Sequence, residues 1–288
     1  MLKKLKELLH RDPEQFRIPR SVQEVIPIRT AWKSGIFLVG PNRYSRTWQF
    51  SDINYALAGE EDQKSMLLGY SGLLNLCDSN ASTKFSVVTR KLNRRDFEDY
   101  IMIPYANDGH DHYRREYNAM LLDKVTDSSN SVVQERYITV STHKKNVDEA
   151  RTFFDRVIGD VTSRLNKLDS HSEELDAIER LRILHDFYRV GEETEFHFNL
   201  KDSMRKGASY KDAICPDSME FKKDHFVMGD RFGRVLFLKE YASYIKDSMI
   251  NELTELNRTL MLSIDVIPVP TDEAVREMQN RLLGVETN

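Results

Sequence analysis

The alternation of apolar and polar residues is clearest in the last third of the chain, which opens with a predicted β-hairpin. Residues 225–228 alternate as a short strand does, and residues 229–233 read as a turn, because glycine adopts positive φ without penalty. Residues 235–238, Val-Leu-Phe-Leu, then form an unbroken apolar run. Such a run predicts a strand that is covered on both faces.

A helix, a strand and a second helix are predicted after this hairpin. Apolar residues at helical spacing predict an amphipathic helix, with its stripe at Ile245, Met249, Leu253, Leu256 and Leu260. Residues 260–266 alternate with period two and predict a strand, which Pro268 ends because proline has no N–H group. The last helix is expected to bury Val275, Met278 and Leu282. Gly284 is expected to end it.

Earlier in the chain, the glycines at 35 and 40 bound a predicted hairpin rather than a nucleotide site. Residues 36–39 and 46–50 read as its strands, with a turn at 40–42. Gly35 and Gly40 have the spacing of a phosphate-binding loop, but Pro41-Asn42 stand where lysine and a hydroxyl residue are needed. Without these side chains the loop lacks the charge for the phosphates and a ligand for magnesium.

The middle of the chain alternates helical and strand patterns. Helices are predicted at 66–77, 94–103, 110–127, 146–168 and 176–188, and strands at 84–89 and 132–140. Two of these helices begin with capping-box signals, Asn146 with Glu149 and Asp176 with Glu179. The fold class predicted is α+β, with two lobes of mixed or antiparallel sheet packed with helices. The expected divisions are 1–30, a basic helix and extended connector; 31–190, a first lobe; 191–217, an irregular insertion or lid; and 218–288, a second ββαβα lobe.

Composition and charge narrow the classes of function. The 288 residues are 40% hydrophobic and 31% charged, with a formal net charge of −4, so binding to nucleic acid or an anionic membrane would need a local patch. No apolar run approaches the roughly 20 residues that span a bilayer, and the N-terminus lacks a secretory signal. Cys77 and Cys215 are interpreted as core residues in a reduced, cytoplasmic setting.

Two local clusters are candidates for interaction. Residues 2–10 form a short amphipathic helix pattern, with the candidate contacts Leu2, Lys3, Lys4, Leu5, Lys6 and Leu9. This helix could lie on a membrane or dock to a partner, or it could pack on its own domain. The second cluster is Arg90, Lys91, Arg94 and Arg95. Nucleic-acid binding is conceivable there, but no aromatic residues interleave for base stacking, so a solvated loop and helix start is favoured.

No motif in the chain predicts catalysis, a metal site or a cofactor site. His110-Asp111-His112 is the one hint of metal ligands. Two histidines two positions apart do not share a helical face, and no cysteine or glutamate partner lies at ligand spacing, so structural or exposed histidines are favoured.

Taken whole, the sequence resembles the N-terminal portion of the conjugation and type IV secretion ATPases, the VirB-four, TraE, TrbE and CagE type. The similarity is to the form carried by integrative conjugative elements (conjugative transposons) of Gram-positive bacteria. It covers essentially all 288 residues. The strings that carry it are MLKKLKELLHRDPEQFRIPRSVQ from Met1, SRTWQFSDINYA from Ser45, YRREYNAMLLDK from Tyr113, RVLFLKEYASYIKDSMI from Arg234 and MLSIDVIPVPTDEAVREMQNRLLGVETN from Met261.

This resemblance implies a non-catalytic docking and assembly domain of a membrane-associated cytoplasmic ATPase that powers secretion and DNA transfer. In that family a C-terminal RecA-like domain binds ATP and magnesium, and its phosphate-binding loop does not occur here. We therefore expect this chain to be a fragment without ATPase activity. The expected partners are inner-membrane channel components and sister ATPase subunits, with peripheral association at the inner face of the cell membrane.

Two alternatives from other classes stay open. A nucleic-acid-handling module that guides DNA to the motor is supported only by the cluster at 90–95, and it predicts DNA retention that falls steeply with salt. An independent enzyme is disfavoured, although residues distant in sequence can converge in a fold.

Overall fold

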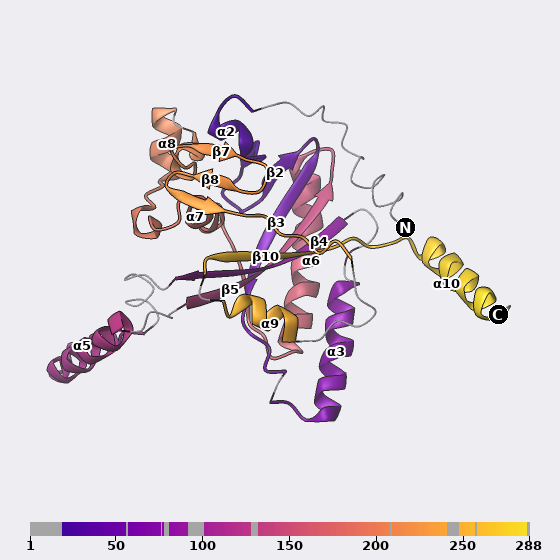
Figure 1. Ribbon diagram of the computed structural model, residues 1–288, viewed down its shortest axis with the longest axis horizontal. Coiled ribbons are helices and arrows are strands. Elements are labelled where there is room, and N and C mark those ends of the chain that lie inside the picture. The colour runs from indigo at the N-terminus through magenta and orange to yellow at the C-terminus, as the bar shows by residue number, and fades with distance from the viewer. Residues whose placement is uncertain are drawn as a thin grey trace.

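The computed structural model describes residues 19–55, 57–75, 77, 81–91, 101–127, 132–207, 209–240, 248–256 and 258–286 (Figure 1). Its strands form one large and one small antiparallel sheet, and all of the predicted strands except 235–238 take part in them. The strands are β1 Thr30–Ala31, β2 Phe37–Gly40, β3 Arg43–Phe50, β4 Ala81–Lys91, β5 Val132–His143, β6 Ser172–Glu174, β7 Met219–Phe221, β8 Phe226–Met228, β9 Arg231–Gly233 and β10 Leu260–Val266. The α-helices are α2 Val22–Val25, α3 Glu60–Leu74, α5 Asp111–Asp127, α6 Val147–Asn166, α7 Ala177–Tyr188, α8 Leu200–Lys206, α9 Ser248–Thr254 and α10 Thr271–Glu286. The predicted α+β class is confirmed.

The main sheet has seven strands in the order β1-β2-β3-β5-β4-β10, and β6 pairs with β3 beside β2. All of its pairs are antiparallel. Ile138 of β5 lies opposite Trp48 of β3 on one side and Phe85 of β4 on the other. Since residues that pair directly share a face of the sheet, these three side chains form one apolar row.

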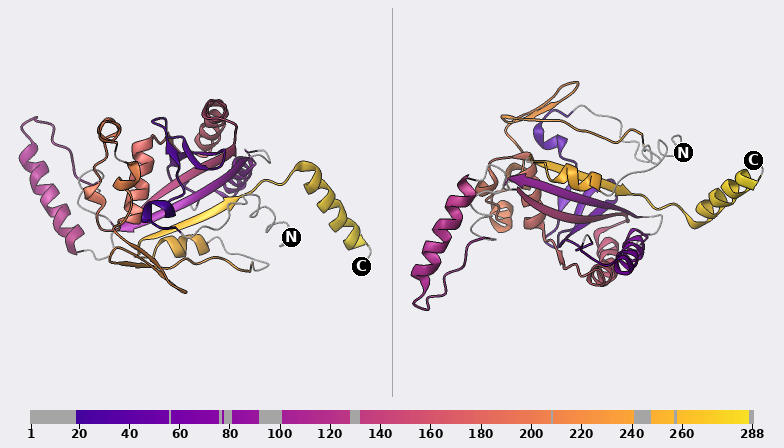
Figure 2. Two further views of the ribbon diagram at one scale, coloured as in Figure 1. Left: turned by 90° about the horizontal axis from the view of Figure 1, so that it is seen from above. Right: turned by 60° about the horizontal axis from the view of Figure 1, so that its bottom comes forward.

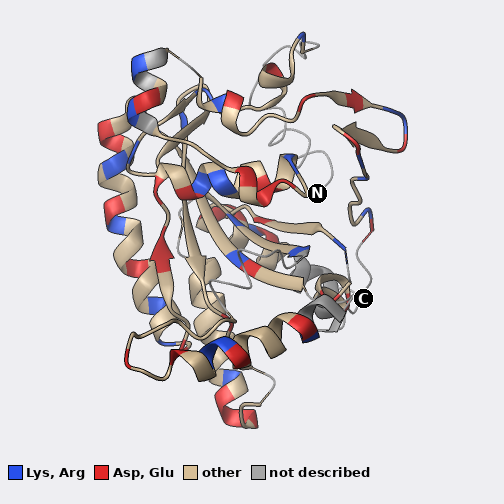
Figure 3. Ribbon diagram, turned by 90° about the vertical axis from the view of Figure 1, so that its left-hand side faces the viewer, with Lys and Arg blue, Asp and Glu red and all other residues tan. Residues whose placement is uncertain are grey.

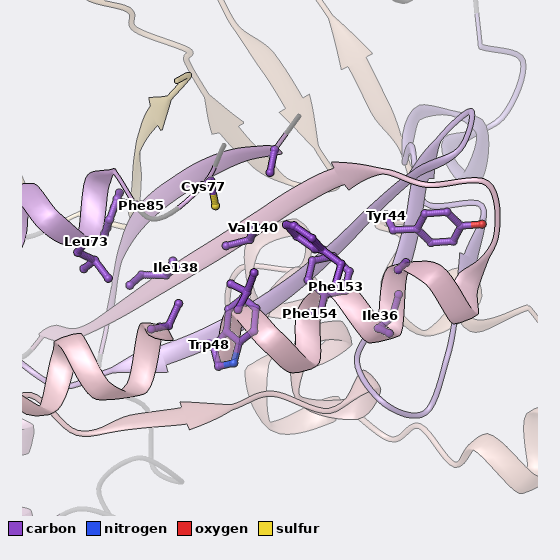
Figure 4. Close-up of a cluster of buried hydrophobic side chains, with 14 of the residues drawn as sticks. Ile36, Tyr44, Trp48, Leu73, Cys77, Phe85, Ile138, Val140, Phe153 and Phe154 are labelled. Carbon is purple, nitrogen blue, oxygen red and sulfur yellow. The ribbon is translucent and has the colours of Figure 1, made fainter. Parts of the chain in front are cut away.

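Helix α6 covers that apolar row. One half of the predicted capping box forms at its N-terminus, because the Asn146 side chain accepts a hydrogen bond from the Glu149 backbone N–H at 2.9 Å. The Glu149 side chain accepts from the Lys145 N–H at 3.3 Å rather than from the N–H of Asn146. Its buried face includes Phe154, whose ring meets Trp48 edge to face at a centroid distance of 6.4 Å (Figure 4). Trp48 and Phe154 are both fully buried, so this contact lies at the centre of the core.

Helix α3 packs beside α6 through two glycines. A Cβ atom at Gly69 would lie 2.9 Å from Leu168 Cδ2, and one at Gly72 would lie 2.5 Å from Arg164 Nη1. These neighbours are the side chains of Arg164 on α6 and of Leu168 just after it, so the absence of a Cβ atom at the two glycines lets α3 approach α6 closely.

The opposite face of the sheet is covered by α7 together with residues 191–217. Asp176 and Glu179 form the predicted capping box at the start of α7. Residues 191–217 contain α8 and two short 3-10 helices, Glu193–Glu195 and Tyr210–Ala213. Far from acting as a lid, this segment buries Phe196, Ile214 and Cys215 in a cluster with Leu181 of α7.

The N-terminal connector also belongs to this layer. The prolines at 19 and 27 led us to expect an extended chain, but the short helix α2 forms between them. Tyr210 fixes the connector from the other side, because its hydroxyl donates to the Ile28 carbonyl at 2.9 Å. Burial raises the pKa of Tyr210 to about 12, which keeps this donor protonated at neutral pH.

The C-terminal third is divided differently from the expected ββαβα lobe. β7, β8 and β9 form a small antiparallel sheet of their own, whereas β10 joins the main sheet as the neighbour of β4. The expected boundary at residue 218 therefore does not separate two complete sheets. Period-two alternation identifies β10 correctly, but it carries no information about which strand will be its partner.

Two helices and one strand of the C-terminal third differ from their predictions. Residues 235–238 form no regular secondary structure and are exposed, rather than being a covered strand, and the second strand of the hairpin is β9 instead. The helix expected from Ile245 is α9, which ends at Thr254, with residues 241–247 outside the described part. Helix α10 continues through Gly284 to Glu286, and its Val275 and Met278 are exposed rather than buried.

We expect Gly35→Ala to destabilise the fold strongly. Gly35 has φ +77°, and a Cβ atom there would lie 2.0 Å from the Leu175 carbonyl oxygen. The backbone conformation costs about 1–2 kcal/mol for alanine, and the clash adds about 1–3 kcal/mol. Urea denaturation measures the sum. Gly207→Ala is the matched control, since Gly207 also has positive φ but has open space around it; equal losses in the two variants would contradict the role assigned to the contact.

Candidate interaction surfaces

Helix α5 projects away from the rest of the molecule (Figure 2). Charge-assisted hydrogen bonds join its first turn to the loop that precedes it. Asp111 accepts hydrogen bonds from the backbone N–H groups of Ala106 and Asn107, at 3.1 and 3.0 Å. Arg114 Nη2 donates to Asp108 at 2.6 Å, and this bond holds the pKa of the Asp108 carboxyl below its usual value. These contacts fix the first turn of the helix relative to the preceding loop.

A second tie joins the middle of α5 to residue 103. The buried Asn118 side chain accepts from the Ile103 N–H and donates to the Ile103 carbonyl, both at 2.9 Å. Because both hydrogen-bonding groups of the amide are used on one residue, the side chain acts as a backbone substitute. The helix is thus held at two points along its length.

The outer face of α5 carries an exposed apolar stripe. Tyr113, Tyr117 and Met120 are spaced i, i+4, i+7 and are all exposed. Residues at this spacing share one face of a helix. Sequence reasoning identified the helix but missed the stripe, although its spacing could have been read from the sequence. A preformed helix with an exposed apolar face is the form that helix-in-groove recognition uses.

The C-terminal arm has the same character. Helix α10 extends away from the body on the side opposite α5 (Figures 1 and 2). Its Val275 and Met278 are exposed, and they are two of the three residues for which the sequence predicts burial. The pattern of an amphipathic helix is therefore present, but this fold does not cover it.

Large apolar side chains are also exposed along the small sheet and the chain that leaves it. Phe221 of β7 and Phe232 of β9 are exposed. Val235, Leu236 and Phe237 follow, with 76%, 81% and 80% of their surface accessible. Exposed apolar patches of this kind mark sites of association.

The predicted basic cluster does not form an open patch where it is described. Arg90 lies on β4 with its side chain buried, and its guanidinium pairs with Glu135 of β5 at 3.1 Å. Lys91 ends β4, and Arg94 and Arg95 lie outside the described residues. A phosphate could reach Arg90 only by displacing the carboxylate. The N-terminal candidates Leu2, Lys3, Lys4, Leu5, Lys6 and Leu9 also lie outside the described residues.

The described residues also offer no group of side chains suited to metal chemistry. No three His, Cys, Asp or Glu residues in this part of the chain gather where they could hold a metal ion. Of the three residues His110-Asp111-His112, Asp111 accepts hydrogen bonds from the loop before α5. The ring centroids of His112 and Tyr113 lie 3.8 Å apart. Cys77 and Cys215 are each buried in a hydrophobic cluster, as the sequence predicts.

Acidic and basic positions are interspersed along the helices seen in Figure 3. None of the described helices combines the length and the apolar character needed to cross a bilayer. Association of this part of the chain is therefore expected to depend on its exposed apolar side chains more than on a broad field of one sign.

Comparison with known proteins adds no relative, since no family model and no curated protein matches the chain.

We expect Arg90 to contribute to stability rather than to DNA binding. Arg90→Ala leaves the half-buried Glu135 without this cation, although Tyr137 still donates to Glu135 at 2.9 Å, so the expected loss is about 1–3 kcal/mol. Arg90→Ala/Glu135→Ala should recover part of that loss, and a double-mutant cycle from urea denaturation measures the coupling. DNA retention on a low-salt column should be the same for each variant as for the parent chain. A loss of retention at unchanged stability would restore Arg90 as a nucleic-acid residue.

Proposed function

We propose that this chain is a non-catalytic docking and assembly domain of the cytoplasmic ATPase that powers type IV secretion and conjugative DNA transfer. ATP and magnesium would bind in a separate C-terminal RecA-like domain. The proposal rests on the resemblance of the whole sequence to the N-terminal portion of these ATPases. It also rests on one structural observation: α5 presents an exposed apolar face and is hydrogen-bonded to the loop that precedes it.

The geometry of α5 fits a docking role better than a structural one. A helix that only stabilises its own domain turns its apolar residues toward the core, as α6 does with Phe154 and Val157. Helix α5 instead turns Tyr113, Tyr117 and Met120 to solvent. Tyrosine is enriched at protein interfaces because it combines a large apolar ring with a polar hydroxyl.

The partners we propose for this face are inner-membrane channel components of the secretion system. Their contact would hold the ATPase peripherally at the inner face of the cell membrane. The N-terminal helix pattern at residues 2–10 is a second candidate contact for the same partners, or for the membrane itself. Sister ATPase subunits are the remaining proposed partners.

Nucleotide turnover tests the assignment of roles. The 288-residue chain is expected to be inert with ATP and magnesium, and a longer chain that includes the RecA-like domain is expected to hydrolyse ATP. Phosphate release by the two purified proteins under the same conditions is the measurement. Turnover by the 288-residue chain that survives repurification would reveal a nucleotide site of its own and would contradict the proposal.

Substitution on α5 tests the docking face. Tyr117→Asp places a charge in the apolar stripe, whereas Ala119→Asp places the same charge on an exposed position of the same helix, away from the stripe. Covering a large apolar side chain is worth about 1.5–3 kcal/mol, so Tyr117→Asp should weaken co-purification with the channel proteins at least about tenfold. Ala119→Asp should bind like the parent chain. Equal binding by all three proteins would rule out this face.

A further inference from the structure

The run Val235–Leu238 exposes four consecutive large apolar residues in a segment that forms no regular secondary structure. Three of them are more than three-quarters exposed, and Leu238 is half exposed. Successive residues of a strand point to opposite faces, so an unbroken apolar run has the composition of a strand from the interior of a sheet. The described residues leave this run uncovered.

The same chain has a sheet edge that lacks a neighbour among the described residues. β10 is the last strand of the main sheet and pairs only on its β4 side. Its seven residues include no proline and one charged residue, Asp265. Ile264, which lies opposite Phe85 of the core row, is 39% exposed. Prolines, multiple charges and bulges usually protect a strand edge from pairing with another chain. β10 has no proline and one charged residue, so its edge has little of this protection.

We propose that the run Val235–Leu238 of one copy of this chain adds as a strand to the β10 edge of a second copy, and that the exchange is reciprocal. The edge supplies backbone hydrogen bonds, which the run makes with no described residue, and the apolar row of the edge continues beside the added side chains on one face. A two-fold dimer then contains two identical contacts. The inference deepens the proposed function and rests on it for its biological meaning, because it assigns a surface to the contact between sister subunits.

A lipid bilayer could also remove the side chains of the run from water, but the hydrogen-bonding needs of the backbone disfavour it. An extended segment in hydrocarbon leaves its N–H and C=O groups without partners, and each costs several kcal/mol. A strand edge satisfies these groups, and on the face of Leu262 and Ile264 it also places apolar side chains beside those of the run. The local charges do not favour an anionic surface either, because Arg234 and Lys222 are paired with Asp224 and Glu220.

The area available matches what a stable dimer needs. Covering one side chain of this size removes about 60–120 Å² of apolar surface from water, so one run contributes about 250–500 Å². Two runs and the two edges they cover bring the total to about 1,000–2,000 Å². Stable protein interfaces bury about 1,200–2,000 Å². A single, unreciprocated contact buries half of that total, so it is expected to bind more weakly than the reciprocal pair.

Sedimentation equilibrium of the purified full chain over a wide concentration range tests the dimer. The parent chain is expected to dimerise reversibly. Leu236→Asp in the run and Ile264→Lys on the edge should each raise the dissociation constant of the dimer about a hundredfold or more. Each substitution occurs twice in a two-fold dimer, so its effect is doubled. Leu57→Asp is the control, since Leu57 is as exposed as Leu236 but lies on neither surface. Circular dichroism confirms that each variant folds.

A mixing experiment tests the pairing itself. Leu236→Asp keeps an intact edge and Ile264→Lys keeps an intact run, so a mixture of the two can form one of the two contacts and should give a heterodimer of intermediate affinity. A parent chain that stays monomeric, a dimer that neither variant weakens, or a mixture without heterodimer would each overturn the proposal. So would binding of a monomeric chain to phosphatidylcholine vesicles that Leu236→Asp abolishes. Channel binding through α5 is measured separately, so failure here leaves that function standing.

Discussion

Strand β3 is bonded to a helical layer on each face of the sheet, and an arginine makes the contact on each face. Arg180 of α7 binds one face of the strand, and Arg46 of the strand itself binds the layer on the other. Ser45 and Arg46 are adjacent, so they point to opposite sides of the sheet. On one side Arg180 of α7 donates to the carbonyls of Gly35 and Ser45, at 2.6 and 2.9 Å, and stacks on Phe37. On the other side Arg46 forms ion pairs with Asp155 of α6, at 3.1 Å, and with Glu174 of β6. Both layers are thus fixed to one strand by charged hydrogen bonds, which are stronger than neutral ones.

This arrangement places two positive charges close together in the interior. Burial lowers the pKa of Arg180 to about 9, and the charge of Arg46 acts in the same direction. Arg180 therefore stays protonated at neutral pH, while its guanidinium donates hydrogen bonds to neutral oxygens of Gly35 and Ser45. The acidic partners of Arg46 offset part of the repulsion. The close approach of Leu175 to Gly35 brings α7 into reach of these carbonyls, which is why a side chain at position 35 would disturb more than a local turn.

The sequence predicts the elements that local chemistry determines and misses those that depend on distant partners. The cap at Asn146, the capping box at Asp176 and the alternation of β10 are local signals, and each is confirmed. The partner of β10, by contrast, lies some 170 positions earlier in β4, and no local period specifies it. Residues 191–217 look irregular because their burial is spread over short helices with no period. The spacing of the apolar residues on α5 can be read from the sequence, but their exposure cannot, because an exposed stripe and a buried one have the same spacing.

The mismatches between predicted and observed burial are concentrated on the surfaces proposed for association. Val235–Leu238 and the pair Val275 and Met278 have the patterns of covered elements, yet the fold leaves both uncovered. An apolar pattern reflects selection for burial, without regard to whether the cover comes from the same chain. The core around Trp48 and Phe154 is fully buried, whereas these two apolar patterns are exposed. This contrast supports burial of the exposed patterns against a second chain. On that argument the C-terminal third completes its packing in the proposed assembly, through the β10 edge, the run Val235–Leu238 and α10.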